Sequence, residues 1–303
     1  MKCIVTGGGG FIGSNLVDDL ISKNHEVFVI DNFCSGSRSN INSNAKVLEV
    51  DISDSSSSEE IVSFMKGGDF VFHLAAMPRV QPSIDEPVDF EKNNTIGTIN
   101  ILKCAVDAKV KRVIYSASSS AYGNTTKIPM LENDKTNPIS PYAMQKLYGE
   151  IACKMFSQVY GIETVSLRYF NVYGERQSME GAYALVIAAF ARMRLENKSL
   201  TIRGDGEQTR DFTYVKDVVN ANILAAESKL VGSGEIINIG SGSQNSVNEI
   251  ATLIGGDTIN VDPVIEPRNT LADTNLAKEL LGWEAKTTIQ EWIPIYKKQL
   301  GID

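Results

Sequence analysis

The 303-residue sequence predicts an α/β fold in which a doubly wound parallel sheet is joined to a smaller, interleaved second lobe. Three observations predict it. Short β-branched segments alternate with amphipathic helical patterns as far as Arg168, a run of four glycines directly follows the first segment, and the alternation breaks down beyond Arg168. Such alternation is typical of parallel strands linked by crossover helices on both faces of one sheet.

The predicted strands share β-branched and aromatic residues bounded by turn residues: Lys2–Thr6, Glu26–Asp31, Lys46–Val50, Phe70–Leu74, Arg112–Ser116 and Thr164–Arg168. Helical patterns long enough to connect parallel strands lie between them: Phe11–Lys23, Val88–Ala108 and Pro141–Tyr160. The sheet domain is therefore expected to span residues 1–168.

Residues 169–303 are expected to form mainly the second lobe. A helix is predicted over Tyr183–Asn197, followed by a glycine-rich turn at Gly204–Gly206 and mixed short elements. One more strand, Glu235–Ile239, is expected to return to the sheet. Residues 212–240 would then contribute to the first domain, so that no linker separates the two lobes.

Composition excludes several classes of partner. The formal net charge of −8 includes no basic tract, which argues against nucleic acid and anionic membranes. The longest apolar run, Ala182–Ala191, is too short to span a bilayer, and too few residues precede the glycines for a signal peptide. The four cysteines lack a CxxC pair, so free thiols in the cytoplasm are favoured over a metal site.

The segment Thr6–Gly13, with sequence TGGGGFIG, follows the first strand and enters a predicted helix. Glycines allow a tight turn and a close approach of the backbone to a pyrophosphate, which then lies at the positive end of the helix. This context predicts a Rossmann-type dinucleotide site. The alternative is a glycine-rich turn without a ligand.

Asp31 ends the second strand, where a carboxylate can accept hydrogen bonds from a ribose 2′-hydroxyl and would repel a 2′-phosphate. NAD is therefore favoured over NADP. Arg38 could meet a phosphate, but a solvated loop arginine is the preferred interpretation. Asp51 and Ile52 follow the third strand where adenine would bind, although Asp51 could equally be an ordinary aspartate at a strand end.

Ser140 and Pro141 predict the start of a helix that places Tyr142 and Lys146 on one face. This spacing arises readily by chance, so its weight comes from its place after the fifth strand. The Lys146 ammonium, with an oxidised nicotinamide, is expected to lower the pKa of Tyr142. Tyr142 could then take a proton from a sugar hydroxyl while hydride leaves the same carbon.

Seven motifs together resemble the extended short-chain dehydrogenase/reductase family, in particular its nucleotide-sugar epimerases and dehydratases. The resemblance covers nearly the whole chain. The motifs are TGGGGFIG (Thr6–Gly13), DN (Asp31–Asn32), FHLAA (Phe72–Ala76), SASSSAYG (Ser116–Gly123), YxxxK (Tyr142–Lys146), RYFNVYG (Arg168–Gly174) and GDGEQTRDF (Gly204–Phe212).

The resemblance implies a role for each matching residue. Ser118 would complete a catalytic triad with Tyr142 and Lys146, although without the resemblance it is one serine in a loop. The residues implied to contact NAD are Gly7, Gly10, Phe11, Ile12, Gly13, Asp31, Asn32, Ser35, Gly36, Asp51, Ile52, Leu74, Ala75, Ala76, Asn94, Ser116, Tyr142, Lys146, Tyr169 and Phe170. The residues implied to contact a UDP-sugar are Ser118, Ser119, Ser120, Asn171, Arg203, Arg210, Arg268 and Thr270. From the residues alone, Arg210 is as readily a surface charge.

The resemblance also indicates the reaction, through the residue types at the two positions that follow Ser118. Dehydratases of the family carry Asp-Glu there and decarboxylases carry a glutamate two places on, whereas this chain has Ser119 and Ser120. The resemblance therefore implies 4-epimerisation: hydride passes from C4 to NAD, the 4-keto sugar turns over, and hydride returns to its opposite face. The alternatives are a related enzyme with net redox change or a different epimerised centre, and a catalytically silent NAD-binding protein.

The family's arginine ahead of a Gly-Asp pair is missing from Asp262–Pro267, which leaves Arg268 as the candidate for its phosphate contact. Thr270 matches the place facing the C2 substituent, where a tyrosine would crowd out an N-acetyl group. Gly181–Tyr183 and Asn171–Gly174 also resemble the enzymes that act on UDP-N-acetylglucosamine. Both UDP-Glc/UDP-Gal and UDP-GlcNAc/UDP-GalNAc interconversion are therefore expected.

A homodimer is expected from the helix at Pro141–Tyr160. Its apolar residues cover about 220° of the helix surface, a wider face than packing against one sheet requires. A wide contact within the chain is the alternative. The residues are Leu147, Tyr148, Ile151, Ala152, Met155, Phe156, Val159 and Tyr160.

Overall fold

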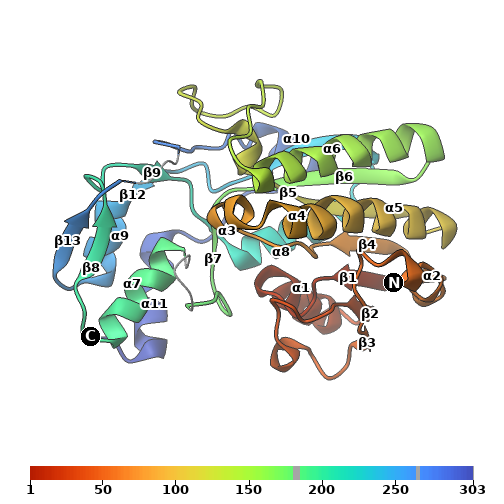
Figure 1. Cartoon of the computed structure of the whole chain (residues 1–303), viewed down its shortest axis with the longest axis horizontal. Coiled ribbons are helices and arrows are strands. Elements are labelled where there is room, and N and C mark those ends of the chain that lie inside the picture. Colours follow the sequence, from red (N-terminus) through yellow and green to blue (C-terminus); the bar gives the residue numbers. More distant parts are fainter. Residues whose placement is uncertain (180–184, 264–266, 303) are drawn as a thin grey trace.

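A computed structural model describes residues 1–179, 185–263 and 267–302. Its centre is a seven-stranded sheet in the order β3-β2-β1-β4-β5-β6-β11, and every neighbouring pair of strands is parallel (Figure 1). The strands are β1 (Lys2–Thr6), β2 (Glu26–Ile30), β3 (Lys46–Leu48), β4 (Phe70–His73), β5 (Arg112–Ser118), β6 (Glu163–Tyr169) and β11 (Ser233–Ile239). The predicted doubly wound sheet is confirmed, and the strand expected near residues 235–239 pairs with β6 at its edge.

Helices cover both faces of the sheet. On one face, α1 (Phe11–Ser22) packs against α8 (Val215–Glu227). On the other face, α5 (Gly97–Asp107) packs between α2 (Ser58–Met65) and α6 (Pro141–Tyr160). Because both faces are covered, the central strands are buried almost throughout, as parallel strands of this kind usually are.

The second lobe lies beside the sheet, on the left of Figure 1. Its two strands, β8 (Leu200–Arg203) and β13 (Thr258–Val261), are parallel, and α7 (Val186–Leu195), α9 (Val247–Ile254) and α11 (Ile289–Leu300) pack around them. The predicted helix at Tyr183–Asn197 is described from Leu185 onward, so Tyr183 lies outside the described residues, and the observed helix ends two residues early.

The remaining elements are short. They are α3 (Val80–Asp85), α4 (Pro87–Glu91), α10 (Asn275–Leu281), the two-residue strands β7 (Val172–Tyr173), β9 (Thr209–Arg210), β10 (Thr213–Tyr214) and β12 (Asn245–Ser246), and the 3₁₀ turns Arg38–Asn40, Ser55–Ser57 and Ser119–Tyr122. Among the described residues, none of the helices has the length and apolar character needed to cross a membrane.

The single helix predicted over Val88–Ala108 is wrong in one respect. The chain forms α4, then a π-helical turn at Lys92–Ile96, then α5. The turn contains Asn94, whose amide bonds to backbone and side-chain groups outside its own helix. Tertiary contacts thus accompany the π-helical turn between α4 and α5. Such turns are frequent at functional sites.

Candidate active site

The three predicted catalytic residues come together at the carboxyl end of β5. Ser118 is the last residue of this strand, and Ser140 caps the following helix by accepting a hydrogen bond from Ala143 N at 3.2 Å. The helix begins at Pro141, so Tyr142 lies in its first turn and Lys146 one turn later. Lys146 is buried, and its Nζ donates to Ser116 O at 2.7 Å.

The environment sets the charge of this pair. Burial lowers the pKa of Lys146 to about 8, although nearby Cys153 and Glu150 act in the opposite direction. Burial also raises the pKa of Tyr142 above its usual 10, while a hydrogen bond with Ser118 lowers it. Lys146 Nζ lies 6.0 Å from the centre of the Tyr142 ring. The expectation that Lys146 and an oxidised nicotinamide together lower the pKa of Tyr142 stays a prediction.

The glycine loop between β1 and α1 fits a pyrophosphate. Gly7 has a φ of 73°, and a Cβ on Gly13 would lie 2.1 Å from Gly7 O, so neither position accepts a larger residue. Gly10 caps α1 in an extended conformation without a side-chain hydrogen bond, and the first turn of α1 has no acidic residue. The positive end of the helix therefore faces this loop with no acidic side chain in its own first turn, which suits an anionic pyrophosphate.

Asp31 stands beside the same loop. Its carboxylate is buried and accepts hydrogen bonds from Gly9 N at 2.8 Å and Phe33 N at 2.7 Å, which leaves acceptor capacity for ribose hydroxyls. Arg38 pairs with Glu49 and lies over the ring of Phe33. These contacts agree with the interpretation of Arg38 as a loop arginine, and they favour NAD.

Further residues predicted to contact NAD surround this loop. A Cβ on Gly36 would lie 2.7 Å from Gly9 C, so the turn containing Ser35 and Gly36 lies against the glycines. A Cβ on Gly7 would meet Ala75 N at 2.7 Å, which places Leu74, Ala75 and Ala76 on the other side. Phe11 and Ile12 begin α1, and Asn32 accepts a hydrogen bond from Cys34 N.

Other predicted NAD contacts are engaged with protein groups. Asp51 accepts from Ser53 N and Oγ, and Ile52 is buried close to Gly97. Ser116 Oγ donates to Tyr169 Oη, which donates to Asn222 Oδ1. Phe170 is completely buried in a cluster with Tyr122, Met130 and Ala272, so its side chain has a packing role.

Four residues that support the site were missed from the sequence. Ser83 Oγ accepts from Tyr142 N at 3.1 Å, and Gln145 Oε1 accepts from Asn94 Nδ2 at 2.9 Å. His73 is buried between Thr6 and Thr98, and burial lowers its pKa to about 3, so it is neutral. Glu150, one helical turn after Lys146 on α6, forms an ion pair with Arg168. Three of them had a signal in the sequence: Gln145 adjoins Lys146, Glu150 lies one helical turn after it, and His73 belongs to the motif FHLAA.

The second lobe supplies the predicted substrate residues. Asn171 Nδ2 donates to Asp211 O at 2.9 Å and to Thr270 Oγ1 at 3.3 Å, and Asp211 N donates to the same hydroxyl. Arg210 Nη1 donates to Arg268 O at 3.2 Å. Asn171, Arg210 and Thr270 are thus brought together around Asp211.

Two of the arginines predicted to contact the substrate are exposed and lie apart from this group of residues. Arg268 forms a bidentate pair with Asp205 at 2.8 Å and is 55% exposed, and Arg203 is exposed at the end of β8. Ser119 and Ser120 begin the turn after Ser118, where Ser120 Oγ donates to Ser118 Oγ at 2.9 Å. Gly181–Tyr183 and positions 264–266 of the segment Asp262–Pro267 lie outside the described residues.

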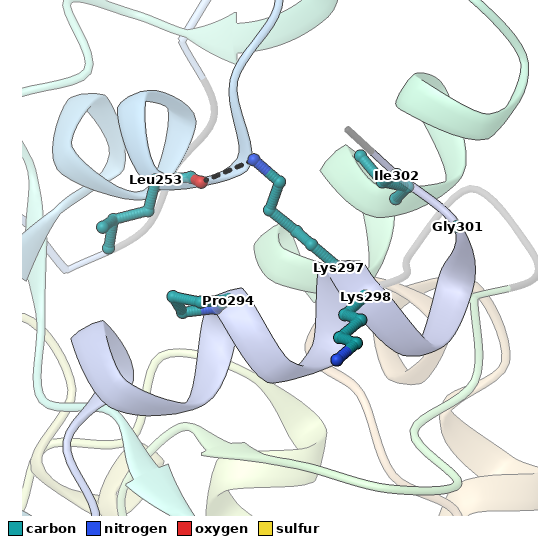
Figure 2. Close-up of a pocket in the computed structure, with 6 residues that line it drawn as sticks. All are labelled: Leu253, Pro294, Lys297, Lys298, Gly301 and Ile302. Carbon is teal, nitrogen blue, oxygen red and sulfur yellow. Dashed lines mark hydrogen bonds between the residues drawn. The ribbon is translucent and has the colours of Figure 1, made fainter.

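Figure 2 shows a hollow elsewhere on the second lobe, between α9 and the end of α11. Lys297 Nζ donates to Leu253 O at 3.4 Å across it. None of the predicted site residues lines it. The lining residues are Leu253, Pro294, Lys297, Lys298, Gly301 and Ile302.

A parallel sheet with a glycine loop, joined to an assembled Ser-Tyr-Lys triad, defines a dinucleotide-dependent enzyme class. Residues 3–240 match the NAD dependent epimerase/dehydratase family, and the chain belongs to this family, whose cofactor is NAD.

Relatives of known name agree with this assignment. A putative UDP-glucose 4-epimerase from Methanocaldococcus jannaschii is 41% identical over 96% of this chain and 95% of the relative. A UDP-N-acetyl-alpha-D-glucosaminuronate decarboxylase from Bacillus cytotoxicus is 39% identical over 82% of this chain and 78% of the relative. The crystal structure of UDP-glucose 4-epimerase from Thermotoga maritima, solved with UDP-glucose, has a TM-score of 0.92 and 38% identity, covering 99% of this chain and all of that chain.

Proposed function

We propose that this protein is an NAD-dependent epimerase that inverts C4 of a UDP-hexose through a transient 4-keto sugar. The observation that carries the proposal is the assembled triad of Ser118, Tyr142 and Lys146, followed by Ser119 and Ser120 in place of acids. When bound, NAD supplies a hydride acceptor that later becomes the hydride donor.

The chain's own groups handle the proton. Tyr142 accepts the proton of the C4 hydroxyl through its Oη, and Ser118 orients the same sugar oxygen. Since burial raises the pKa of Tyr142, the tyrosinate needs help from positive charge. Lys146 carries such a charge in a buried site, where it acts over a longer range than in water.

The second lobe would hold the nucleotide. Asn171 and Arg210 offer an amide and a guanidinium for the diphosphate, and Arg268 could join them by leaving Asp205. Thr270 lies 3.3 Å from Asn171 and is small, which supports acceptance of an acetamido group at C2. Both UDP-Glc/UDP-Gal and UDP-GlcNAc/UDP-GalNAc would then be substrates.

We also propose a cytoplasmic homodimer formed through α6. Ala152 and Phe156 pack inward, but much of the apolar surface of the helix stays exposed. Such a face is typical of subunit contacts. The exposed residues are Met144 (52%), Tyr148 (39%), Ile151 (61%), Met155 (38%), Val159 (67%) and Tyr160 (48%).

The decarboxylase among the relatives suggests the main rival function. In this chain Ser120 stands at the place of the glutamate that the family's decarboxylases carry, which favours epimerisation. The test is to incubate purified protein with UDP-galactose without added NAD and to measure UDP-glucose. Equilibration of the two sugars is expected. A requirement for added NAD with net reduction of the cofactor would indicate an oxidoreductase instead, and no turnover would indicate a silent NAD-binding protein.

A further inference from the structure

The carboxylate of Asp211 is completely buried between the segment that follows β11 and the segment at residues 270–272. Its Oδ1 accepts from Ser241 N at 2.6 Å and from Ser241 Oγ at 2.7 Å. Its Oδ2 accepts from Gly242 N at 3.1 Å and from Ala272 N at 3.0 Å. All four partners donate, which suits an ionised carboxylate, because such a group only accepts.

The backbone of the same residue holds the side chains that are predicted to meet the substrate. Asn171 Nδ2 donates to Asp211 O at 2.9 Å, and Asp211 N donates to Thr270 Oγ1 at 3.2 Å. Arg210 directly precedes Asp211 in the chain. Asn171 has a φ of 27°, which residues with a Cβ adopt uncommonly and which persists where the surrounding structure holds it.

The place of this carboxylate is fixed by the end of the sheet. Gly240 directly follows β11, and a Cβ on it would lie 2.7 Å from Asp211 Oδ2 and 2.4 Å from Ala272 Cβ. The strand β11 is parallel to β6, which is parallel to β5, so the carboxyl ends of all three strands lie at one edge of the sheet. Ser118 of the triad ends β5 at this same edge.

We propose that Asp211 is a positioning residue for the UDP-sugar. Its carboxylate ties the segments that carry the predicted substrate residues to the end of β11, and so sets their distance from the triad. The four partners of the carboxylate are all protein groups, so Asp211 acts through its neighbours. The proposal rests on the proposed function, in which Asn171 and Arg210 hold the diphosphate and Thr270 faces the sugar.

The test measures Asp211→Asn against the native enzyme. An amide accepts through one oxygen only, and its NH₂ group would face N–H groups that themselves need acceptors. The Kd for UDP by calorimetry and the KM for UDP-galactose should therefore rise by about tenfold or more. The kcat at saturating substrate should change by less than about threefold and bound NAD should stay the same, because the triad and the glycine loop keep their own contacts.

Asp217 offers a matched control. It is also a buried aspartate, in the first turn of α8, and its Oδ2 accepts from Lys286 N and Thr287 N, both at 3.0 Å. Neither partner is predicted to meet the substrate. Asp217→Asn should lower the melting temperature but leave the Kd for UDP and the KM unchanged. An equal rise of KM in both variants would show a general loosening of the fold and would overturn the proposal.

Two milder variants decide the case if Asp211→Asn does not fold. Ser241→Ala removes one of the four donors and should raise the Kd for UDP by about threefold. Gly240→Ala crowds the carboxylate and should raise it as well. An unchanged Kd in both variants, or in a folded Asp211→Asn, would overturn the proposal.

The proposed function fails separately. A native enzyme that binds UDP but epimerises no UDP-sugar would overturn the proposed function, while the Kd values for UDP would still decide the role of Asp211. A native enzyme that does not bind UDP would overturn both.

Discussion

Replacing Glu150 by glutamine should affect both stability and the pH dependence of activity. Glu150 is completely buried on α6, one turn after Lys146, and its two oxygens accept from Arg168 Nε at 2.8 Å and Nη2 at 2.7 Å. Glutamine keeps one acceptor oxygen but leaves the Arg168 charge uncompensated. Besides Glu150, the partners of this guanidinium are Glu132 O at 3.2 Å and the ring of Tyr122.

The cost can be estimated from this geometry. Removing one partner of a buried ion pair costs about 3–5 kcal/mol, and the retained oxygen places Glu150→Gln near the lower value. An unfolding entropy of about 2.1 cal/mol/K per residue over 303 residues gives about 0.64 kcal/mol/K. A loss of about 3 kcal/mol should therefore lower the melting temperature by about 5 °C.

The same substitution should shift the pH profile. Burial lowers the pKa of Lys146 to about 8, and Cys153 and Glu150 partly offset this by raising it. Without the Glu150 charge, the pKa of Lys146 falls further. Activity that needs protonated Lys146 is present below this pKa and lost above it, so the alkaline limb of kcat should move to lower pH.

Differential scanning fluorimetry and initial rates of UDP-galactose epimerisation between pH 6 and pH 10 measure the two effects. Glu284→Gln is the control, because Glu284 forms an exposed pair with Lys278 and its loss should change the melting temperature by no more than about 1 °C. An alkaline limb that stays in place or moves to higher pH would refute the electrostatic reasoning. An unchanged melting temperature would refute the estimate for the buried pair.

Three further predictions concern chemistry, specificity and assembly. Tyr142→Phe keeps the packed ring but removes the proton acceptor, so epimerase activity should fall by about 100-fold or more while NAD stays bound; near-normal turnover would contradict the assignment. Thr270→Tyr should suppress turnover of UDP-GalNAc relative to UDP-Gal by at least about tenfold, or about 1.4 kcal/mol, and native enzyme inactive on UDP-GalNAc would disprove the role of Thr270 in admitting the acetamido group. Ile151→Glu places a charge on the exposed face of α6 and should convert a dimer to a monomer in light scattering; a native protein already monomeric at micromolar concentration would remove the dimer proposal.

The helix carrying the proposed catalytic pair was predictable from the sequence because its signals are local. Ser140 and Pro141 mark its beginning, and Gly161 in the left-handed conformation follows its last residue, so the predicted bounds Pro141–Tyr160 agree with the structure. The glycine loop was predictable for the same reason, since its turn and the following helix adjoin in sequence.

Features that depend on distant partners were not predictable. The π-helical turn at Lys92–Ile96 contains Asn94, whose amide meets Met77 and Gln145, 17 and 51 positions away. Nothing in the local pattern distinguishes this segment from an ordinary helix. The backbone of Arg79, with a φ of 99°, likewise has no local signal, and the residues on either side of it bond to distant Asn94 and Tyr142.

The contacts of Arg268 bear on the proposal that this residue replaces the family's usual phosphate-binding arginine. Backbone hydrogen bonds from Thr209 N to Arg268 O and from Thr270 N to Thr209 O fix the chain beside Arg210. The Arg268 side chain instead reaches Asp205, and this hydrogen-bonded pair lowers the pKa of Asp205 to about 2. Because both side chains are more than half exposed, exchanging this carboxylate for a diphosphate replaces one anion by another at little cost. A fixed backbone with an exposed guanidinium is thus consistent with the proposal that Arg268 leaves Asp205 to contact the diphosphate.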